Sequence, residues 1–378
     1  MINKLKTKMT MLLAILMVFQ YSSVFAAETN SEFNLQTAID TALSNSSSLK
    51  LYDEKIKNAT DIYYRYNDKA ISSKDAPVLT GKELQKTNDL YFIENRKIQV
   101  LYPEQKKNDL DNLKYEKQNE IVDIKLNITE NYFKLLFLEK QISYQNALIA
   151  RLDADLKVKK NDVKLGRSVA SAVTKIELDI KRAKNELVQL NREENNSKMS
   201  LNSLLGRKIT DEIQIKDIDV PDTDYDSIDI KSVIEDRQKN NNKIKDIKFN
   251  IEQAKLEAEI VKENTNREDP VELDTLEDTR LNQEYALKDE IINIEKHVYQ
   301  ENNTILNLED EIAIKQLNKE ICDKDLEVAN EKLKHGLLSK SDLNAVIDAA
   351  EEANIEYLKA KLDFYLEVQR FNAYMEKL

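Results

Sequence analysis

Residues 121–166 read IVDIKLNITENYFKLLFLEKQISYQNALIARLDADLKVKKNDVKLG. In this stretch an aliphatic side chain recurs every seven residues, at Ile121, Ile128, Leu135, Ile142, Ile149, Leu156 and Val163. An apolar seam with a strict seven-residue period is typical of long helices that supercoil against partner helices. The stretch therefore predicts one long helix that packs along a coiled-coil seam.

The chain is expected to turn back directly after this helix. Gly166 follows the last seam residue, and glycine readily takes the left-handed conformation that ends helices. The apolar pattern then resumes at Val173, Ile176, Ile180, Ala183, Leu187, Leu190, Leu201 and Leu204. This order predicts an antiparallel helical hairpin whose tip lies at Gly166.

The same unit recurs 170 residues later in the chain. The first seam then maps onto Ile291, Val298, Ile305, Ile312, Lys319, Leu326 and Leu333, with one polar interruption. Gly166 maps onto Gly336, which predicts a second tip. The helix before each hairpin also repeats, but at an offset of 195, so that Leu35 aligns with Ile230. Two offsets indicate a tandem duplication with a 25-residue insertion in the first copy.

The composition agrees with a chain of long helices. The 378 residues are 33% charged and include only 4 Gly and 4 Pro, which is too few turn-forming residues for a sandwich, a propeller or a glycine-looped α/β enzyme. The predicted fold is all-α, with long antiparallel coiled-coil hairpins in two tandem repeats. The predicted division is a signal peptide (1–26), a first repeat (34–206, insert about 66–110, tip at Gly166), an acidic linker (207–229) and a second repeat (230–378, insert about 264–285, tip at Gly336).

The N-terminal segment has the pattern of an export signal. Lys4, Lys6 and Lys8 precede an apolar run that is too short to span a membrane, and residues 24–26 resemble a small-residue cleavage site. We expect the mature chain to be exported to the cell envelope. Removal of the three lysines would lower the net charge from −12 to −15, which argues against binding nucleic acid or an anionic membrane surface through bulk charge.

Several motifs in their order resemble the TolC-like outer-membrane efflux protein family. They are FNLQTAIDTAL at 33–43, VKLGR at 163–167, LNSLLG at 201–206 and LKHGLLSKSDL at 333–343. The resemblance extends over nearly the whole mature chain. It implies a homotrimer whose hairpins close into a tunnel, an α-barrel, that meets a membrane-fusion adaptor and a cytoplasmic-membrane transporter. In that family each repeat also supplies two strands to an outer-membrane β-barrel.

The expected strands are weak in this sequence. A membrane-spanning strand needs about 9–11 residues that alternate between apolar and polar. The first insert offers only residues 89–93 and 97–102, and residues 264–278 are polar and acidic without alternation. We therefore expect the helical duct to be retained with little or no β-barrel. The chain would then lie in the outer membrane only if a barrel forms, and otherwise elsewhere outside the cytoplasm or at the cell surface.

The resemblance also points to candidate functional residues at the tips. Asp342 lies six residues after Gly336, where many family members have an aspartate facing the tunnel entrance, and a trimer would place three such carboxylates around a constriction. Alternatively, Asp342 caps the start of the return helix. The tip residues implied to contact the adaptor are Gly166, Arg167, Gly336, Leu337 and Leu338. Each glycine is equally interpretable as a plain helix C-cap.

No enzyme chemistry is predicted. Two His and one Cys, widely spaced, offer neither a catalytic triad nor a zinc site, and we expect no cofactor. The preferred interpretation is a TolC-like conduit for passive transport of substrates that a pump and adaptor deliver. The alternative is a structural or scaffolding coiled-coil protein of the cell envelope that forms no pore.

Overall fold

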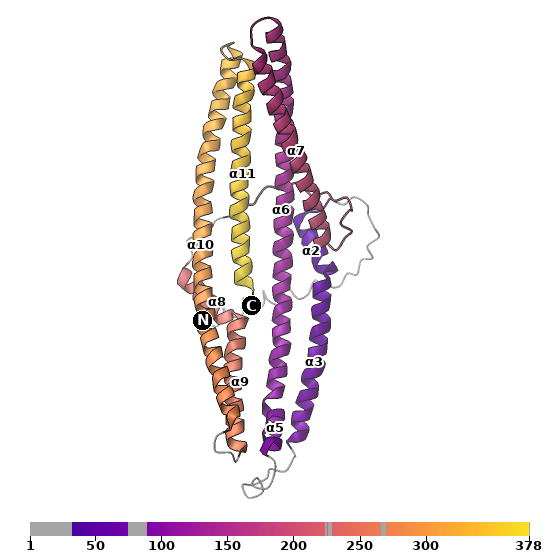
Figure 1. Cartoon of the computed structure of the whole chain (residues 1–378), viewed down its shortest axis with the longest axis vertical. Helices are drawn as coiled ribbons and strands as arrows, with labels where there is room; N and C mark the ends of the chain where they lie inside the picture. Colours follow the sequence, from indigo (N-terminus) through magenta and orange to yellow (C-terminus); the bar gives the residue numbers. More distant parts are fainter. Residues whose placement is uncertain (1–31, 75–88, 224, 226–228, 266–269, 378) are drawn as a thin grey trace, which may run out of the picture.

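The computed structural model describes residues 32–74, 89–223, 225, 229–265 and 270–377, and these are almost entirely helical (Figure 1). The predicted signal peptide lies outside the described residues. The helices are α2 (Leu35–Asn45), α3 (Ser47–Ser73), α5 (Asp89–Val100), α6 (Tyr102–Lys164), α7 (Ala170–Leu204), α8 (Ile230–Asn240), α9 (Asn242–Asn264), α10 (Val271–Lys334) and α11 (Lys340–Glu376). Within the described residues the only β-pairing is an isolated bridge between Phe33 and Ile215. The prediction of an all-α fold is confirmed.

The two longest helices, α6 and α10, form the frame of the molecule. They have 63 and 64 residues, which corresponds to a length of about 95 Å each. Each turns back into a shorter antiparallel partner, α7 or α11, and Figure 1 shows both turns at the same end. The predicted seams face these partners, since Ile128, Leu135 and Val298 are fully buried. The heptad pattern thus identified the faces that pack.

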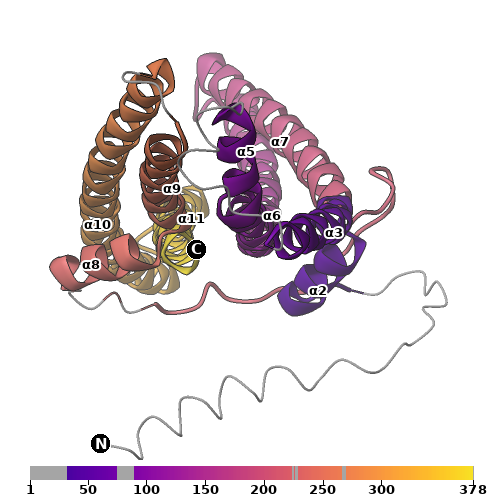
Figure 2. The same ribbon diagram turned by 90° about the horizontal axis from the view of Figure 1, so that it is seen from below.

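The helices stand side by side as a curved wall. In the half with the turns, contacts run from α10 to α11, from α11 to α6 and from α6 to α7. In the other half they run from α10 to α9, from α9 to α6 and from α6 to α3, and α5 packs against α9, α6 and α3. Figure 2 shows α2, α8 and the linker between α7 and α8 along one face of this wall. Apart from this belt and α5, the wall is one helix thick.

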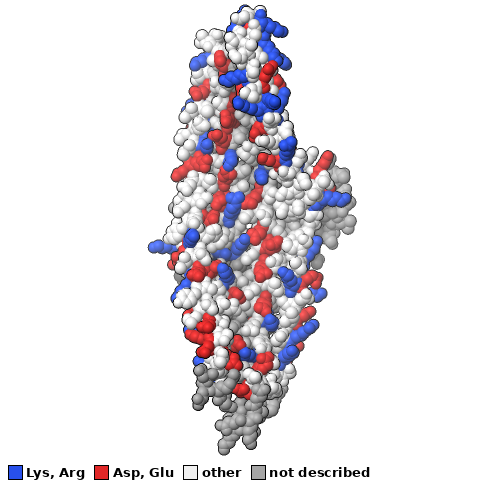
Figure 3. All heavy atoms as spheres, in the orientation of Figure 1, with Lys and Arg blue, Asp and Glu red and all other residues white. Residues whose placement is uncertain are grey.

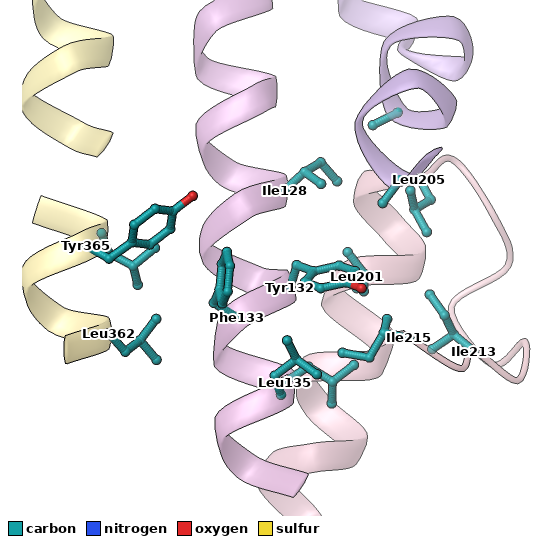
Figure 4. Packing of buried hydrophobic residues seen from close by; sticks show 14 residues of the cluster. Ile128, Tyr132, Phe133, Leu135, Leu201, Leu205, Ile213, Ile215, Leu362 and Tyr365 are labelled. Atoms are coloured by element: carbon teal, nitrogen blue, oxygen red, sulfur yellow. The ribbon is translucent and has the colours of Figure 1, made fainter. Parts of the chain in front are cut away.

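The main hydrophobic core lies where the belt crosses the wall (Figure 4). It joins α6, α7, the linker and α11 through Ile128, Tyr132, Phe133, Leu135, Leu201, Leu205, Ile213, Ile215, Leu362 and Tyr365. The hydroxyl of Tyr132 is within hydrogen-bond distance of the carbonyl oxygens of Phe33 (3.0 Å) and Lys216 (2.7 Å). The first part of the acidic linker is therefore anchored in the core and is not a free tether.

Both inserts contain more helix than the sequence division suggests. Residues 89–93 and 97–100, the candidate strand segments, belong to α5. Ile93 of α5 and Leu101, the residue directly after it, pack with Ile260 and Val261 of α9, so contacts with a helix bury these apolar side chains. In the second repeat α10 begins at Val271, directly after Pro270 as N-cap. Acidic Glu272 and Asp274 in the first turn favour a helix start there, because they complement the helix dipole.

Two glycines with the same backbone conformation allow a test of the contact between the end of α2 and the residues that follow α7. Gly206 (φ 67°) and Gly336 (φ 72°) are both left-handed, so alanine costs each about 1–2 kcal/mol. A Cβ on Gly336 meets nothing, whereas one on Gly206 would lie 2.8 Å from the Cβ of Asn45 and disturb the 2.8 Å bond from the Asn45 Nδ2 to the Leu205 carbonyl. We expect Gly206→Ala to lower the free energy of unfolding by at least about 1 kcal/mol more than Gly336→Ala in urea titrations. Equal losses would contradict this close approach of α2 and α7.

Candidate functional site at the hairpin tips and wall edges

The two tips have the same backbone structure. At the first, the Arg167 amide donates to the Asp162 carbonyl (2.8 Å) and the Gly166 amide to the Val163 carbonyl (3.1 Å). At the second, Leu337 donates to Lys332 (2.8 Å) and Gly336 to Leu333 (3.0 Å). This pattern is the Schellman motif, which requires a left-handed residue at the glycine position. It accounts for both glycines without a functional role, and it also presents their neighbours at the end of the molecule.

The residues implied as adaptor contacts differ in how they are presented. Arg167 and Leu337 are exposed, Leu337 to 76%. Leu338 is half-buried and lines an apolar groove of about 370 Å³ between α10 and α11. The groove is lined by Cys322, Asp325, Val328, Ala329, Lys332, Leu338, Ala345, Val346 and Ala349. The second tip therefore offers both an exposed leucine and a small apolar recess.

Asp342 is tied to the start of α11. Ser339 is the N-cap, and its hydroxyl accepts a hydrogen bond from the Asp342 amide (3.1 Å) and donates one to the Asp342 carboxylate (2.6 Å). This reciprocal bonding resembles a capping box. The first hairpin lacks it, because Val169 occupies the N-cap position without a side-chain bond. Asp342 nevertheless remains exposed, so capping and a role at a constriction are compatible.

An ion-pair cluster near the tips joins the two hairpins, and no sequence pattern indicated it. Arg151 of α6 donates to Asp348 and to Glu351 of α11, each at 2.5 Å, and its side chain is only 16% exposed. Nearby, Asn344 donates to Asp155 at 2.9 Å. These contacts join residues about 200 positions apart, so only the packing of α6 against α11 brings them together.

One edge of the wall, α10, exposes a second apolar stripe. Seven large apolar residues, each 41–64% exposed, follow one another in steps of seven residues with one step of eight: Tyr285, Ile292, Tyr299, Leu306, Ile314, Ile321 and Val328. Such spacing keeps them on one side of the helix. The stripe lies one residue beyond the predicted seam as far as Leu306 and two residues beyond it from Ile314 on, so its spacing was readable in the sequence.

The opposite edge, formed by α7 and α3, also exposes large apolar side chains. They include Leu178, Val188 and Met199 on α7. On α3 the exposed apolar residues lie on two sides of the helix, with Leu51 and Ile62 on one side and Tyr64 and Ile71 roughly opposite. A contiguous exposed apolar surface on an otherwise charged protein marks an interaction surface.

A titratable cluster lies between α10 and α11 near mid-length. Burial, and then a hydrogen bond and the charge of Glu367, raise the pKa of Glu301 to about 7. Burial, and then Arg237, lower the pKa of His297, whose ring packs edge-on against Tyr374 with 4.1 Å between ring centroids. His297 Nδ1 and the Glu301 carboxyl are 3.5 Å apart. The raised pKa of Glu301 and the lowered pKa of His297 both disfavour the charged form of this pair.

Two further kinds of site were sought in the described part of the chain. No group of three or more His, Cys, Asp or Glu side chains converges there in a way that could hold a metal ion. No helix within the described ranges has a stretch long and apolar enough to cross a bilayer.

Comparison with known proteins identifies the fold. No protein-family profile and no curated protein matches the sequence. Among solved structures, the outer membrane protein VceC from Vibrio cholerae is 13% identical with a TM-score of 0.64, over 90% of this chain and 95% of that chain. The chain has a TolC-like fold.

Two further structures extend this TolC-like similarity. The outer membrane channel CmeC of Campylobacter jejuni is 11% identical with a TM-score of 0.64, over 94% of this chain and 90% of that chain. The open state of the outer membrane channel MtrE of Neisseria gonorrhoeae is 13% identical with a TM-score of 0.63, over 95% and 94%. The resemblance stated from the tip and repeat motifs is confirmed at the level of fold.

The Glu301 cluster predicts a pH dependence of stability. Because the pKa of Glu301 is raised from 4.5 to about 7 on folding, the folded state holds the proton more tightly, and stability falls as pH rises through this window. Glu301→Gln should therefore raise the melting temperature at pH 8 and change it little at pH 5. Glu309→Gln, a change at an exposed position on the same helix, is the control and should shift the melting temperature equally at pH 5 and pH 8. A Glu301→Gln effect that is the same at pH 5 and pH 8 would contradict this cause.

Proposed function

We propose that this chain is the subunit of a passive, TolC-like efflux or secretion conduit in the cell envelope. Copies stand side by side, close into a homotrimeric helical duct and catalyse no reaction. Substrates are handed over by a membrane-fusion adaptor and a cytoplasmic-membrane transporter. Export by the N-terminal segment brings the chain to this location.

The two apolar edges of the wall are the observation that supports this proposal. The wall is one helix thick along much of its length, so no second layer covers the stripe on α10 or the apolar residues of α7 and α3. These two edges differ in residues and lie on opposite sides of the chain. Contact between unlike surfaces of identical subunits is heterologous, and it generates a closed ring when the rotation between copies closes. The curvature visible in Figure 2 suits such a ring.

The similar structures are consistent with a duct. CmeC and MtrE are outer membrane channels, and this chain matches nearly their whole length. The resemblance to the TolC-like family further implies that three copies assemble and that an adaptor and a pump are partners.

The adaptor is proposed to contact the end of the molecule where both hairpins turn. Gly166 and Arg167 belong to the first tip, and Gly336, Leu337 and Leu338 to the second. Leu337 and the groove lined by Leu338 would receive apolar side chains of a partner helix.

The alternative function is a scaffold that forms no pore. The α10 stripe has heptad spacing, so it could also pack against the same stripe of a second copy. That contact is isologous and gives a dimer without a passage. The arrangement of copies therefore separates the two functions.

Charges placed on the α10 stripe test the ring. We expect Ile314→Glu combined with Ile321→Glu to convert the assembly into single chains, because unpaired carboxylates in an apolar contact are costly. Ala313→Glu is the matched control: Ala313 is exposed on α10 but lies about 100° around the helix from Ile314. Light scattering measures the mass of the assembly. Export is measured in a host strain that lacks the gene and carries each variant, as the accumulation of dyes and toxic compounds in the cells.

We expect wild type and Ala313→Glu to assemble as trimers and to restore export, and the double variant to do neither. If the double variant assembles and restores export like wild type, the edges are not the contact. If the chain is a dimer and deletion of its gene changes the export of no compound, the scaffold function is favoured instead.

The proposed constriction at Asp342 has its own test. Asp342→Asn removes a charge but keeps a side chain that can bond the Ser339 hydroxyl, whereas Ser339→Ala loosens the cap and keeps the charge. If three carboxylates line the passage, Asp342→Asn should lower the preference for cations in conductance through the reconstituted assembly, and Ser339→Ala should not. Loss of preference in both variants, or in neither, would assign Asp342 to capping alone.

A further inference from the structure

The two hairpin tips carry very different charge. The first tip, residues 157–175, contains six Lys or Arg and one acidic residue, a net charge of +5. The matching span of the second tip, residues 327–345, contains three of each and is neutral. This contrast stands out in a chain whose overall charge is −12. Figure 3 shows the basic side chains gathered at the end of the molecule formed by the turn between α6 and α7.

Most basic residues of the first tip form no ion pair within the described part of the chain. Only Lys160 forms an ion pair, with Glu177 at 2.8 Å. The other five, which form no ion pair in the structure, are Lys157, Lys159, Lys164, Arg167 and Lys175. The second tip also has one ion pair, Lys334 with Glu331 at 2.6 Å, but only two basic residues without one among the described residues, Lys332 and Lys340. Unpaired like charges repel one another, so their concentration at one tip implies a partner of opposite charge.

Exposed aliphatic side chains lie among these basic residues. Val158, Leu165 and Val169 are 54%, 56% and 66% exposed. Lysine and arginine beside exposed aliphatic residues form the pattern of segments that rest at a membrane interface, where the cations meet headgroups and the apolar groups enter the boundary with the acyl chains. An acidic protein surface would account for the charges but not for these apolar groups at the extreme end.

The shape of the tip also favours a flat surface over a protein pocket. The end of a hairpin presents two helices, each about 10–12 Å across, which is a small area beside the roughly 800 Å² per partner of a stable protein interface. A charged bilayer needs no complementary shape. Residues 157–175 extend no more than about 14 Å from the turn, so much of the acidic body lies beyond the screening length of about 8–10 Å at physiological salt.

We propose that the first hairpin tip docks on an anionic membrane surface, with the five unpaired basic residues at the lipid headgroups and Leu165 and Val169 at their boundary. This goes beyond the conduit function and does not require it, since a scaffold with the same tip would bind in the same way. In a conduit, a first tip on the membrane would leave the adaptor contact to the second tip, at Gly336, Leu337 and Leu338. In a trimer, three tips would bind together and strengthen the attachment.

Vesicle sedimentation tests the proposal with the full chain lacking residues 1–26. The vesicles are phosphatidylcholine alone or mixed with phosphatidylglycerol, at low and high salt. The first-tip variant is Lys164→Gln, Arg167→Gln and Lys175→Gln. The matched control removes three positive charges from the other tip, as Lys332→Gln, Lys334→Gln and Lys340→Gln. Circular dichroism checks helicity, and light scattering checks that the number of copies is unchanged.

We expect wild type to bind only vesicles with phosphatidylglycerol, and less at high salt. Each basic residue at the surface adds roughly five-fold to partitioning, so the first-tip variant should lose about 100-fold and the control far less. Equal losses in both variants, or no wild-type binding to anionic vesicles, would overturn the proposal. A chain that does not bind vesicles but is captured on a polyglutamate surface in a salt-sensitive way would also overturn the proposal, in favour of an acidic protein partner. The ring variant Ile314→Glu with Ile321→Glu should still bind through one tip, so failure of the conduit and failure of the docking are distinguishable.

Discussion

A wall one helix thick has no second layer to bury the outer sides of its edge helices. In this chain α6 and α11 lie in the middle of the wall and are covered by neighbours on both sides. By contrast α10 and α7 have one side without a neighbour, and there they expose large apolar residues. The hydrophobic effect favours covering such surfaces. The proposed contact between copies follows from this constraint.

Ion pairs and a ring contact hold the two repeats together along the middle of the wall. Near the tips, Arg151 joins α6 to α11 through Asp348 and Glu351. In the core, the rings of Phe133 and Tyr365 meet edge-on with 5.0 Å between centroids. The pair between Arg370 and Glu130, at 2.6 Å, adds a third link. One chain can therefore act as a single curved segment of a larger wall.

The sequence predicted those features that depend on helix geometry alone. Heptad spacing identified buried positions such as Ile128 and Leu135, and a glycine after each seam identified both turns. Features that depend on tertiary packing were not predictable in this way. The Arg151 cluster needs α6 beside α11, and the helicity of the first insert needs the apolar contacts of Ile93 with α9. The lysines of the first tip are readable in the sequence, but whether they pair depends on the fold.

Imaging the purified assembly along its long axis by electron microscopy tests the central claim most directly. The account predicts a closed ring of identical subunits around a central passage, with α10 of each copy against α7 and α3 of the next and all tips at one end. A compact dimer in which the α10 stripes of two copies pack against each other, with no passage, would contradict it.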